Sequence, residues 1–506
     1  MAIPSATCSP HAGKALGDLS RGHADDYIYP VHLLDGAEYQ HCILTLFIKF
    51  NDILDAGKIK DSLTRLLEID DWKKLGGRFR TKVHEASTLE ADSRKPSKAF
   101  EIHVPRKYTA ERPAIQFAQE AYDGSIFEHP FGRQLPQASH DGVALSPPLD
   151  ELRPFGHAPG FPMTMADLVD RDAPQLSFKV ITYTDATILA ITFSHCTWDV
   201  SGLQGFLKSL GLVLDGREDE VPPMLGAKAD ILSELTSHYD GSGCDPELLT
   251  VPGETKAMGQ PPAPNAALEQ RIIRVPLENM QRLHSRVALE NPTEDEDVLS
   301  TYQLDELFLA LIVQQIARAQ AVPRALRLLN VFNARLVVPR LAKARGIYSQ
   351  NLVLLTPQTL SNEAATGPMG PIALAHRECL AQCAEPQSIT RSLHTVLGAI
   401  ESELDITRLM DSTDADSVLV NNLVRLSSHI DLDLSSAVVR QGEISATRRN
   451  GLGTADSCYL TLPPNSYGMM RVTTLGSYNG NSCWMIGELP PRAWELIYEA
   501  LDDLEW

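Results

Sequence analysis

"ITFSHCTWDVSG" (residues 191–202) joins a strand-like run to a helix-like run, and the interpretation of the whole 506-residue chain starts from it. Across 187–195, which includes the first part of this stretch, apolar residues alternate with small or polar ones, and this is the two-residue period of a β-strand. After it, apolar residues recur at helical spacing from Leu203 to Leu210. The stretch therefore places His195 at the end of a strand and Asp199 in the turn before a helix.

His195 has two interpretations at this point. The alternation puts it on the same strand face as Leu189, Ile191 and Phe193. An imidazole there can accept a proton near neutral pH, and an aspartate four residues later can orient it or shape its loop. The other interpretation is a buried histidine bonded to a main-chain carbonyl. The local pattern does not decide between a base and a core residue.

Composition is that of an ordinary globular chain, with 43% hydrophobic and 22% charged residues. The formal net charge of −20 and the lack of a basic patch exclude nucleic acid as an expected partner, because phosphate backbones would be repelled. Eight cysteines without regular spacing indicate free thiols in a reducing compartment. No stretch resembles a signal peptide or reaches membrane-spanning length, so we expect a cytoplasmic protein without membrane insertion.

Strand and helix patterns alternate along the rest of the chain. We expect strands at 42–50 and 176–184, a helix from about Ala56, and a long helix over 300–320. Ser201 with Gln204 has the spacing of a capping box at the helix that follows Asp199.

The clearest change of composition is at 251–267, a stretch rich in Pro, Gly and Ala without periodicity. We interpret its surroundings, 241–270, as a crossover linker between two domains, 1–240 and 271–506. Mixed strands and helices in two halves predict an α/β protein.

Other chemical sites have weaker support. No G-x-S-x-G elbow is present, and Ser194 points to the opposite strand face from His195, which disfavours a hydrolase triad. His376, Cys379 and Cys383 share one face of a predicted helix, so metal ligation is conceivable there. Two thiols packed into a core with a histidine at its rim explain that pattern more simply. We therefore expect no bound metal.

The central stretch, "SHCTWDVSG", resembles the H-x-x-x-D signature of BAHD-type acyl-CoA-dependent acyltransferases, including the fungal branch that decorates secondary metabolites. Three other segments resemble parts of that family in the right order. They are "LTRLLEIDDWKKLGGRF" (63–79), "LSTYQLDELFLALIVQQIARAQ" (299–320) and "NVFNARLVVPRLAKARGIYSQNLVLL" (330–355). The resemblance covers most of the chain loosely and is strongest between 176 and 355.

The resemblance implies two chloramphenicol-acetyltransferase-like halves with an active-site channel between them. His195 would be the general base that removes the acceptor's proton. Asp199, the second residue of the motif, would pair with Arg335 and hold the loop in shape, and Gly202 would permit close approach at the helix start. The positions implied for substrate or CoA binding are Ser300, Thr301, Tyr348 and Asn351.

The implied reaction moves an acyl group, in the simplest case acetyl, from CoA to a hydroxyl of a hydrophobic secondary metabolite such as a terpenoid, polyketide or alkaloid. Acyl-CoA would then be a co-substrate, with no permanently bound cofactor. The expected partners are acyl-CoA and a small-molecule alcohol, and we expect a monomer.

Two departures from the family keep alternatives open. Val200 follows Asp199 where the family usually has glycine, and the later D-F-G-W-G run is absent, its counterpart "DLSS" (433–436) having neither glycine. One alternative is acyl transfer or condensation from a carrier protein, although condensation domains usually have two histidines in tandem and this chain has Ser194 first. The other is a non-catalytic binding or scaffold relative of the same fold.

Overall fold

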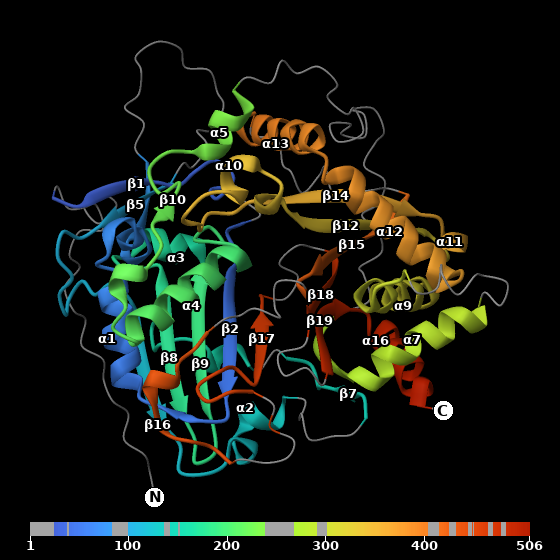
Figure 1. Ribbon diagram of the computed structural model, residues 1–506, viewed down its shortest axis with the longest axis horizontal. Coiled ribbons are helices and arrows are strands. Elements are labelled where there is room, and N and C mark those ends of the chain that lie inside the picture. Colours follow the sequence, from blue (N-terminus) through green and yellow to red (C-terminus); the bar gives the residue numbers. More distant parts are fainter. Residues whose placement is uncertain are drawn as a thin grey trace, which may run out of the picture.

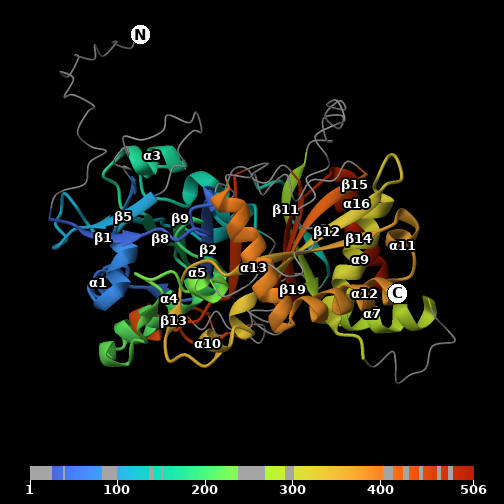
Figure 2. The same ribbon diagram turned by 90° about the horizontal axis from the view of Figure 1, so that it is seen from above.

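Two β-sheets organise the molecule, one in each of two halves that lie side by side (Figure 1). The view from above shows the same division (Figure 2). The computed structural model describes residues 25–37, 40–82, 100–135, 142–149, 152–237, 268–290, 301–402, 414–424, 432–443, 448, 450–463, 469–476 and 482–505.

The first half is built on a five-stranded sheet of order β17-β2-β9-β8-β6. Its strands are β17 (Ser457–Thr461), β2 (Ile43–Phe50), β9 (Thr187–Ser194), β8 (Leu176–Thr182) and β6 (Gln116–Ala121). Helices α1 (Ala56–Leu66) and α4 (Val200–Leu214) pack against each other over this sheet (Figure 1). The strands expected at 42–50, 176–184 and 187–195 and the helix from Ala56 are confirmed.

The second half is built on a seven-stranded sheet of order β14-β12-β15-β18-β19-β11-β7. Its strands are β14 (Val353–Leu360), β12 (Ala325–Asn333), β15 (Ala415–Asn422), β18 (Met470–Gly476), β19 (Ser482–Leu489), β11 (Glu269–Pro276) and β7 (Ala144–Leu145). Its main helices are α7 (Leu277–Glu290), α9 (Leu304–Arg318), α11 (Asn362–Thr366), α12 (Met369–Cys383) and α16 (Pro491–Asp502). Helix α9 packs against the other four, which explains why its sequence is apolar on nearly every side.

Smaller elements complete the fold. A three-stranded sheet contains β1 (Tyr27–Pro30), β5 (Phe100–Val104) and β4 (Arg78–Thr81). Two short pairs join β10 (Met224–Leu225) to β13 (Ile347–Tyr348) and β16 (Val438–Arg440) to β3 (Ile53–Leu54). The remaining helices are α2 (Pro130–Arg133), α3 (Met165–Asp170), α5 (Ile231–Thr236), α10 (Pro339–Ala342) and α13 (Pro386–Glu401).

The two halves exchange strands. Strand β17, late in the chain, pairs with β2 in the first sheet, and β7, early in the chain, pairs with β11 in the second. The predicted α/β class is confirmed. Residues 241–267 of the predicted linker lie outside the described part of the chain, so the division at 241–270 stays a prediction. None of the described helices combines the length and the apolar character that crossing a bilayer requires.

Gly453 supports the segment "DLSS" (433–436), which lies where the chain returns to the first half. The amide of Leu434 donates a hydrogen bond to the carbonyl oxygen of Gly453 at 2.9 Å. Gly453 has a φ of +67°, and a Cβ at this position would collide with the backbone of Ser435. The segment 433–436 contains no glycine itself, so the glycine that its close packing requires is Gly453, in the loop that contacts it.

We expect Gly453→Ala to lower the free energy of unfolding by about 3 kcal/mol. The change adds a left-handed backbone penalty of roughly 1–2 kcal/mol and a steric collision with Ser435 of similar size. Gly216→Ala is the matched control, because Gly216 has a φ of +74° but no described atom within 4 Å of the added Cβ. Urea unfolding measures both variants, and equal losses would show that the contact with Ser435 contributes nothing.

Candidate active site

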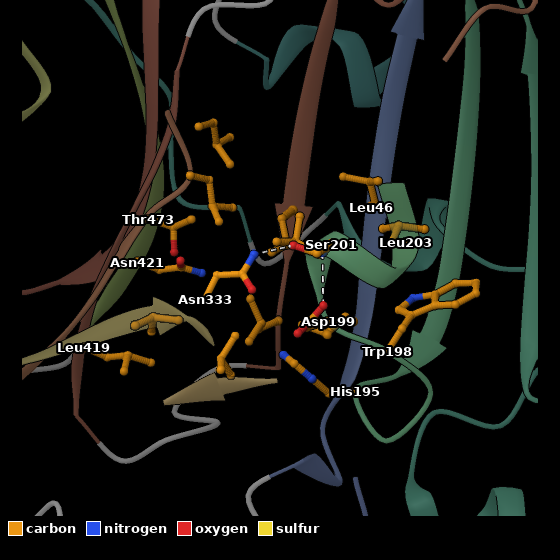
Figure 3. A pocket seen from close by; sticks show the side chains of 18 of the residues that line it. Leu46, His195, Trp198, Asp199, Ser201, Leu203, Asn333, Leu419, Asn421 and Thr473 are labelled. Atoms are coloured by element: carbon orange, nitrogen blue, oxygen red, sulfur yellow. Dashed lines mark hydrogen bonds between the residues drawn. The ribbon is translucent and has the colours of Figure 1, made fainter. Parts of the chain in front are cut away.

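A pocket lies between the two sheets and receives side chains from both halves. The first half contributes residues of β2, the end of β9, the start of α4 and β17, and the second half contributes residues of β12, β14, β15 and β18. Most of these side chains are apolar. Figure 3 shows His195 and Asp199 at one side of the pocket and Asn421 and Thr473 at the other.

His195 follows β9 directly, and its ring points into the pocket (Figure 3). Its main chain is held from both sides: its amide donates to the carbonyl of Cys42 at 2.9 Å, and its carbonyl accepts a 2.9 Å bond from the side-chain amide of Asn351. The ring atom Nδ1 is buried and has no hydrogen-bond partner within the described chain. Hydrogen bonds of its backbone thus hold the imidazole in place, and its ring nitrogen Nδ1 can still bond to a ligand.

Burial lowers the pKa of the His195 imidazole below its ordinary value of about 6.5, because the charged form loses hydration. The carboxylate of Asp199 opposes this shift by its charge but does not reverse it. The ring is therefore neutral at pH 7, which is the form that can accept a proton.

Both carboxylate oxygens of Asp199 accept hydrogen bonds from groups other than the His195 ring. One oxygen caps helix α4, accepting from the amides of Ser201 and Gly202 at 3.1 Å each. The other accepts from Arg335 at 2.7 Å and from the amide of Leu352 at 3.0 Å. The helix cap is Asp199, so the capping box predicted from Ser201 and Gln204 is wrong: Asp199 already accepts the first free amides of the helix.

Arg335 connects Asp199 to the second half of the molecule. Its guanidinium donates to the carbonyl of Tyr348 at 3.0 Å and to the carbonyl of Gln350, and it lies 5.5 Å from the centre of the Tyr348 ring. Both members of the Asp199–Arg335 pair are largely shielded, with side-chain exposures of 4% and 12%. The pair therefore ties the turn before α4 to the segment around β13.

A second bridge crosses between the halves inside the pocket. The side-chain amide of Asn333, at the end of β12, donates to the hydroxyl of Ser201 at 2.9 Å (Figure 3). Gly202 meets the second half as well, because a Cβ there would collide with the carbonyl of Ser349. The start of α4 is thus fixed against the second half at three positions, Asp199, Ser201 and Gly202.

The other predicted site residues lie outside the pocket wall or outside the described residues. Tyr348 and Asn351 are buried behind the wall, where they contact Arg335 and the His195 backbone. Thr301 is exposed just before α9, and its carbonyl accepts a bond from Arg377. Ser300 lies outside the described residues.

The metal-site candidate on α12 consists of a buried His376 with Cys379 and Cys383 half-buried. Burial lowers the pKa of His376. Within the part of the chain that the structure describes, no group of three or more His, Cys, Asp or Glu side chains is arranged to hold a metal ion.

Asp35 is a supporting residue that the sequence did not reveal. One of its oxygens accepts both the main-chain amide of Asn351, at 2.8 Å, and the side-chain amide, at 2.7 Å. That same side-chain amide donates to the carbonyl of His195, so Asp35 orients Asn351 and Asn351 holds the histidine. Burial raises the pKa of the Asp35 carboxyl, against the charges of Lys74 and His32. No sequence spacing links position 35 to position 351.

Comparison with known proteins gives relatives over nearly the full chain, although no family model matches it. The O-acyltransferase pboC of Aspergillus ustus is 29% identical over 91% of this chain and 96% of that protein. The acetyltransferase sphE of Aspergillus fumigatus is 26% identical over 94% of this chain and 96% of that protein. A partial relative, the transcriptional regulator calD of Penicillium decumbens, is 32% identical over 45% of this chain and 44% of that protein.

Among solved structures, TRI101 of F. graminearum in complex with coenzyme A and deoxynivalenol has the same fold. The TM-score is 0.62 at 14% identity, covering 93% of this chain and 96% of that chain. The predicted two-domain acyltransferase fold and the resemblance to fungal acyltransferases are confirmed.

Arg335→Met should lower the free energy of unfolding by about 3 kcal/mol, because it leaves the Asp199 carboxylate buried without its counter-charge. The matched control is Arg340→Met, which breaks a pair with Glu234 whose side chains are 57% and 52% exposed. That control should cost less than about 1 kcal/mol. Both variants are measured by urea unfolding. A loss below about 1 kcal/mol for Arg335→Met would show that the Asp199–Arg335 pair does not hold the two halves together.

Asp35→Ala should lower kcat roughly ten- to a hundredfold, because Asn351 loses its acceptor and His195 loses its fixed position. Asp35→Asn retains an oxygen that can accept both bonds and should stay close to wild type. The measurement is release of CoA from acetyl-CoA in the presence of a hydroxylated acceptor. If Asp35→Asn is as impaired as Asp35→Ala, the charge of Asp35 matters and the positioning role is wrong.

Proposed function

We propose, from the premise that this chain is a BAHD-type acyltransferase related to fungal acetyl- and O-acyltransferases, that it transfers an acetyl group from acetyl-CoA to a hydroxyl of an apolar small molecule. The observation that carries this proposal is the ring of His195 facing a pocket between the halves, with Asp199 turned away into an ion pair. Acetyl-CoA is a co-substrate in this reaction.

His195 acts as the general base in the proposed mechanism. Its ring accepts the proton of the acceptor hydroxyl as the oxygen attacks the thioester carbonyl, forming the new C–O bond. The carbon–sulfur bond then breaks, and the imidazolium returns the proton to the departing CoA sulfur. The reaction needs no acyl-enzyme intermediate, because both substrates are held in one complex and the base activates the acceptor directly.

The lining of the pocket supports an apolar acceptor. Side chains such as Leu44, Leu46, Phe193, Leu460 and Leu462 offer little to a charged molecule and bury a hydrocarbon skeleton favourably. The structure of TRI101 in complex with coenzyme A and deoxynivalenol, which has the same fold, supports a small-molecule acceptor together with CoA. The cytoplasmic location and the monomeric state stay predictions from the sequence.

A non-catalytic role is the second candidate, and the partial relative named as a transcriptional regulator is the observation in its favour. A scaffold gains nothing from a desolvated imidazole that faces a pocket and whose Nδ1 has no hydrogen-bond partner among the described residues. The carrier-protein alternative has no specific observation in its favour among the described residues. Calorimetry with acetyl-CoA discriminates between these candidates, since binding to the isolated chain favours the CoA-dependent enzyme.

His195→Ala should lower kcat/KM by 10²–10⁴-fold while acetyl-CoA still binds, because only the proton transfer is lost. In the wild type, kcat/KM should rise with pH with a midpoint below pH 6.5, since burial lowers the pKa of His195 and the base must be neutral. Initial rates of CoA release between pH 5 and 8 measure both effects.

The variant provides the control for this profile, since it should lack the ionisation below pH 6.5. A wild-type midpoint above 6.5, or a variant that retains the same ionisation, would reject His195 as the titrating base.

A further inference from the structure

The polar side chains of the pocket divide into those already engaged and those that are free. Asp199, Ser201 and Asn333 make hydrogen bonds within the protein. Asn421 and Thr473 also line the pocket, but neither side chain has a hydrogen-bond partner in the described part of the chain. Thr473 is 2% exposed and Asn421 is half-buried, so both side chains lie in the pocket wall rather than on the outer surface.

Asn421 and Thr473 form a pair on the second sheet. They are directly opposite each other in the register of the parallel strands β15 and β18, and Figure 3 shows them side by side. Two positions further along lie Leu475 on β18 and Leu423 just past the end of β15, and both line the pocket. The pair is therefore a small polar patch next to an apolar wall.

The chemistry of the pair matches a neutral oxygen. A carboxamide and a hydroxyl each offer one donor and one acceptor function, which suits a hydroxyl or a carbonyl of a ligand. A ligand that displaces water from these two groups must offer them hydrogen bonds in return, because leaving them unpaired would cost free energy. Arg471 also lines the pocket, two positions before Thr473 on β18, but it faces Glu488 at 3.9 Å and both side chains are 4% exposed. A charged ligand group would disturb that pair.

We propose that Asn421 and Thr473 form an acceptor subsite for a second, neutral oxygen, so that the preferred acceptors are apolar molecules with two oxygen functions. This inference rests on the proposed function. His195 lies at the other side of the pocket, so the hydroxyl to be acetylated sits there while the second oxygen reaches the pair. The hydrocarbon body between them contacts the leucines of the wall.

The experiment compares matched acceptors that differ by one oxygen. Three skeletons (p-menthane, decalin and androstane) are each offered as a mono-alcohol and as a diol, with acetyl-CoA held constant. Products are quantified by mass spectrometry, and the readout is the ratio of kcat/KM for the diol to that for the mono-alcohol. For at least one skeleton, the wild type should prefer the diol by about tenfold or more.

Three variants test the assignment of this preference. Asn421→Leu and Thr473→Val are close in shape to the natural side chains but lack the polar groups, and each should reduce the diol preference by about tenfold. Thr473→Ser retains the hydroxyl and should retain the preference. Thermal melting by circular dichroism verifies that each variant is folded.

Three outcomes would overturn the inference. Equal use of mono-alcohols by the wild type would show that the second oxygen is not recognised. A similar loss for both acceptors with an unchanged ratio would place the pair at the reacting carbonyl instead. If calorimetry shows acetyl-CoA binding but no diol is acetylated, the acceptor class is wrong and the CoA-dependent function stands. Failure of the wild type to bind acetyl-CoA would reject the proposed function itself.

Discussion

A carboxylate buried between two packed halves must be given donors and a counter-charge, and the fold around the pocket follows from how Asp199 meets that requirement. Its four hydrogen bonds come from the start of α4, from Arg335 and from Leu352, so one side chain joins the helix cap, the turn after β9 and the second half. Because His195 lies in this turn, the position of the proposed base depends on the same contacts.

The exchange of strands strengthens this arrangement. Since β17 completes the first sheet and β7 extends the second, the halves are joined by main-chain hydrogen bonds far from Asp199 as well as by the ion pair. The space between the sheets is therefore enclosed by two rigid surfaces. Side chains at the strand ends project into it in fixed directions, which is what a two-substrate reaction requires of its pocket.

The sequence allowed the local elements and the central motif to be predicted, because both depend on short-range patterns. Alternation across 187–195 predicted β9, and the spacing from Leu203 predicted α4. Long-range partners were accessible only where a family resemblance supplied them, as for Arg335. Asp35 acts on His195 through Asn351, 316 positions away, and no periodicity encodes that contact. The same limit applies to Asn421 and Thr473, which meet through strand pairing between separate segments.

The geometry also constrains how His195 can work as the proposed base. In a relay, a carboxylate would bond to the imidazole and stabilise its charged form, but both oxygens of Asp199 are already bonded elsewhere. The imidazole is instead prepared by burial, which keeps the ring neutral at pH 7, and by hydrogen bonds from its backbone to Cys42 and Asn351. A neutral, fixed imidazole suits a reaction in which the proton is taken from the acceptor and returned to the departing thiolate, because the charge on the ring is transient. Positioning by the fold thus acts together with the charge of Asp199, which raises the pKa of the ring without a hydrogen bond to it.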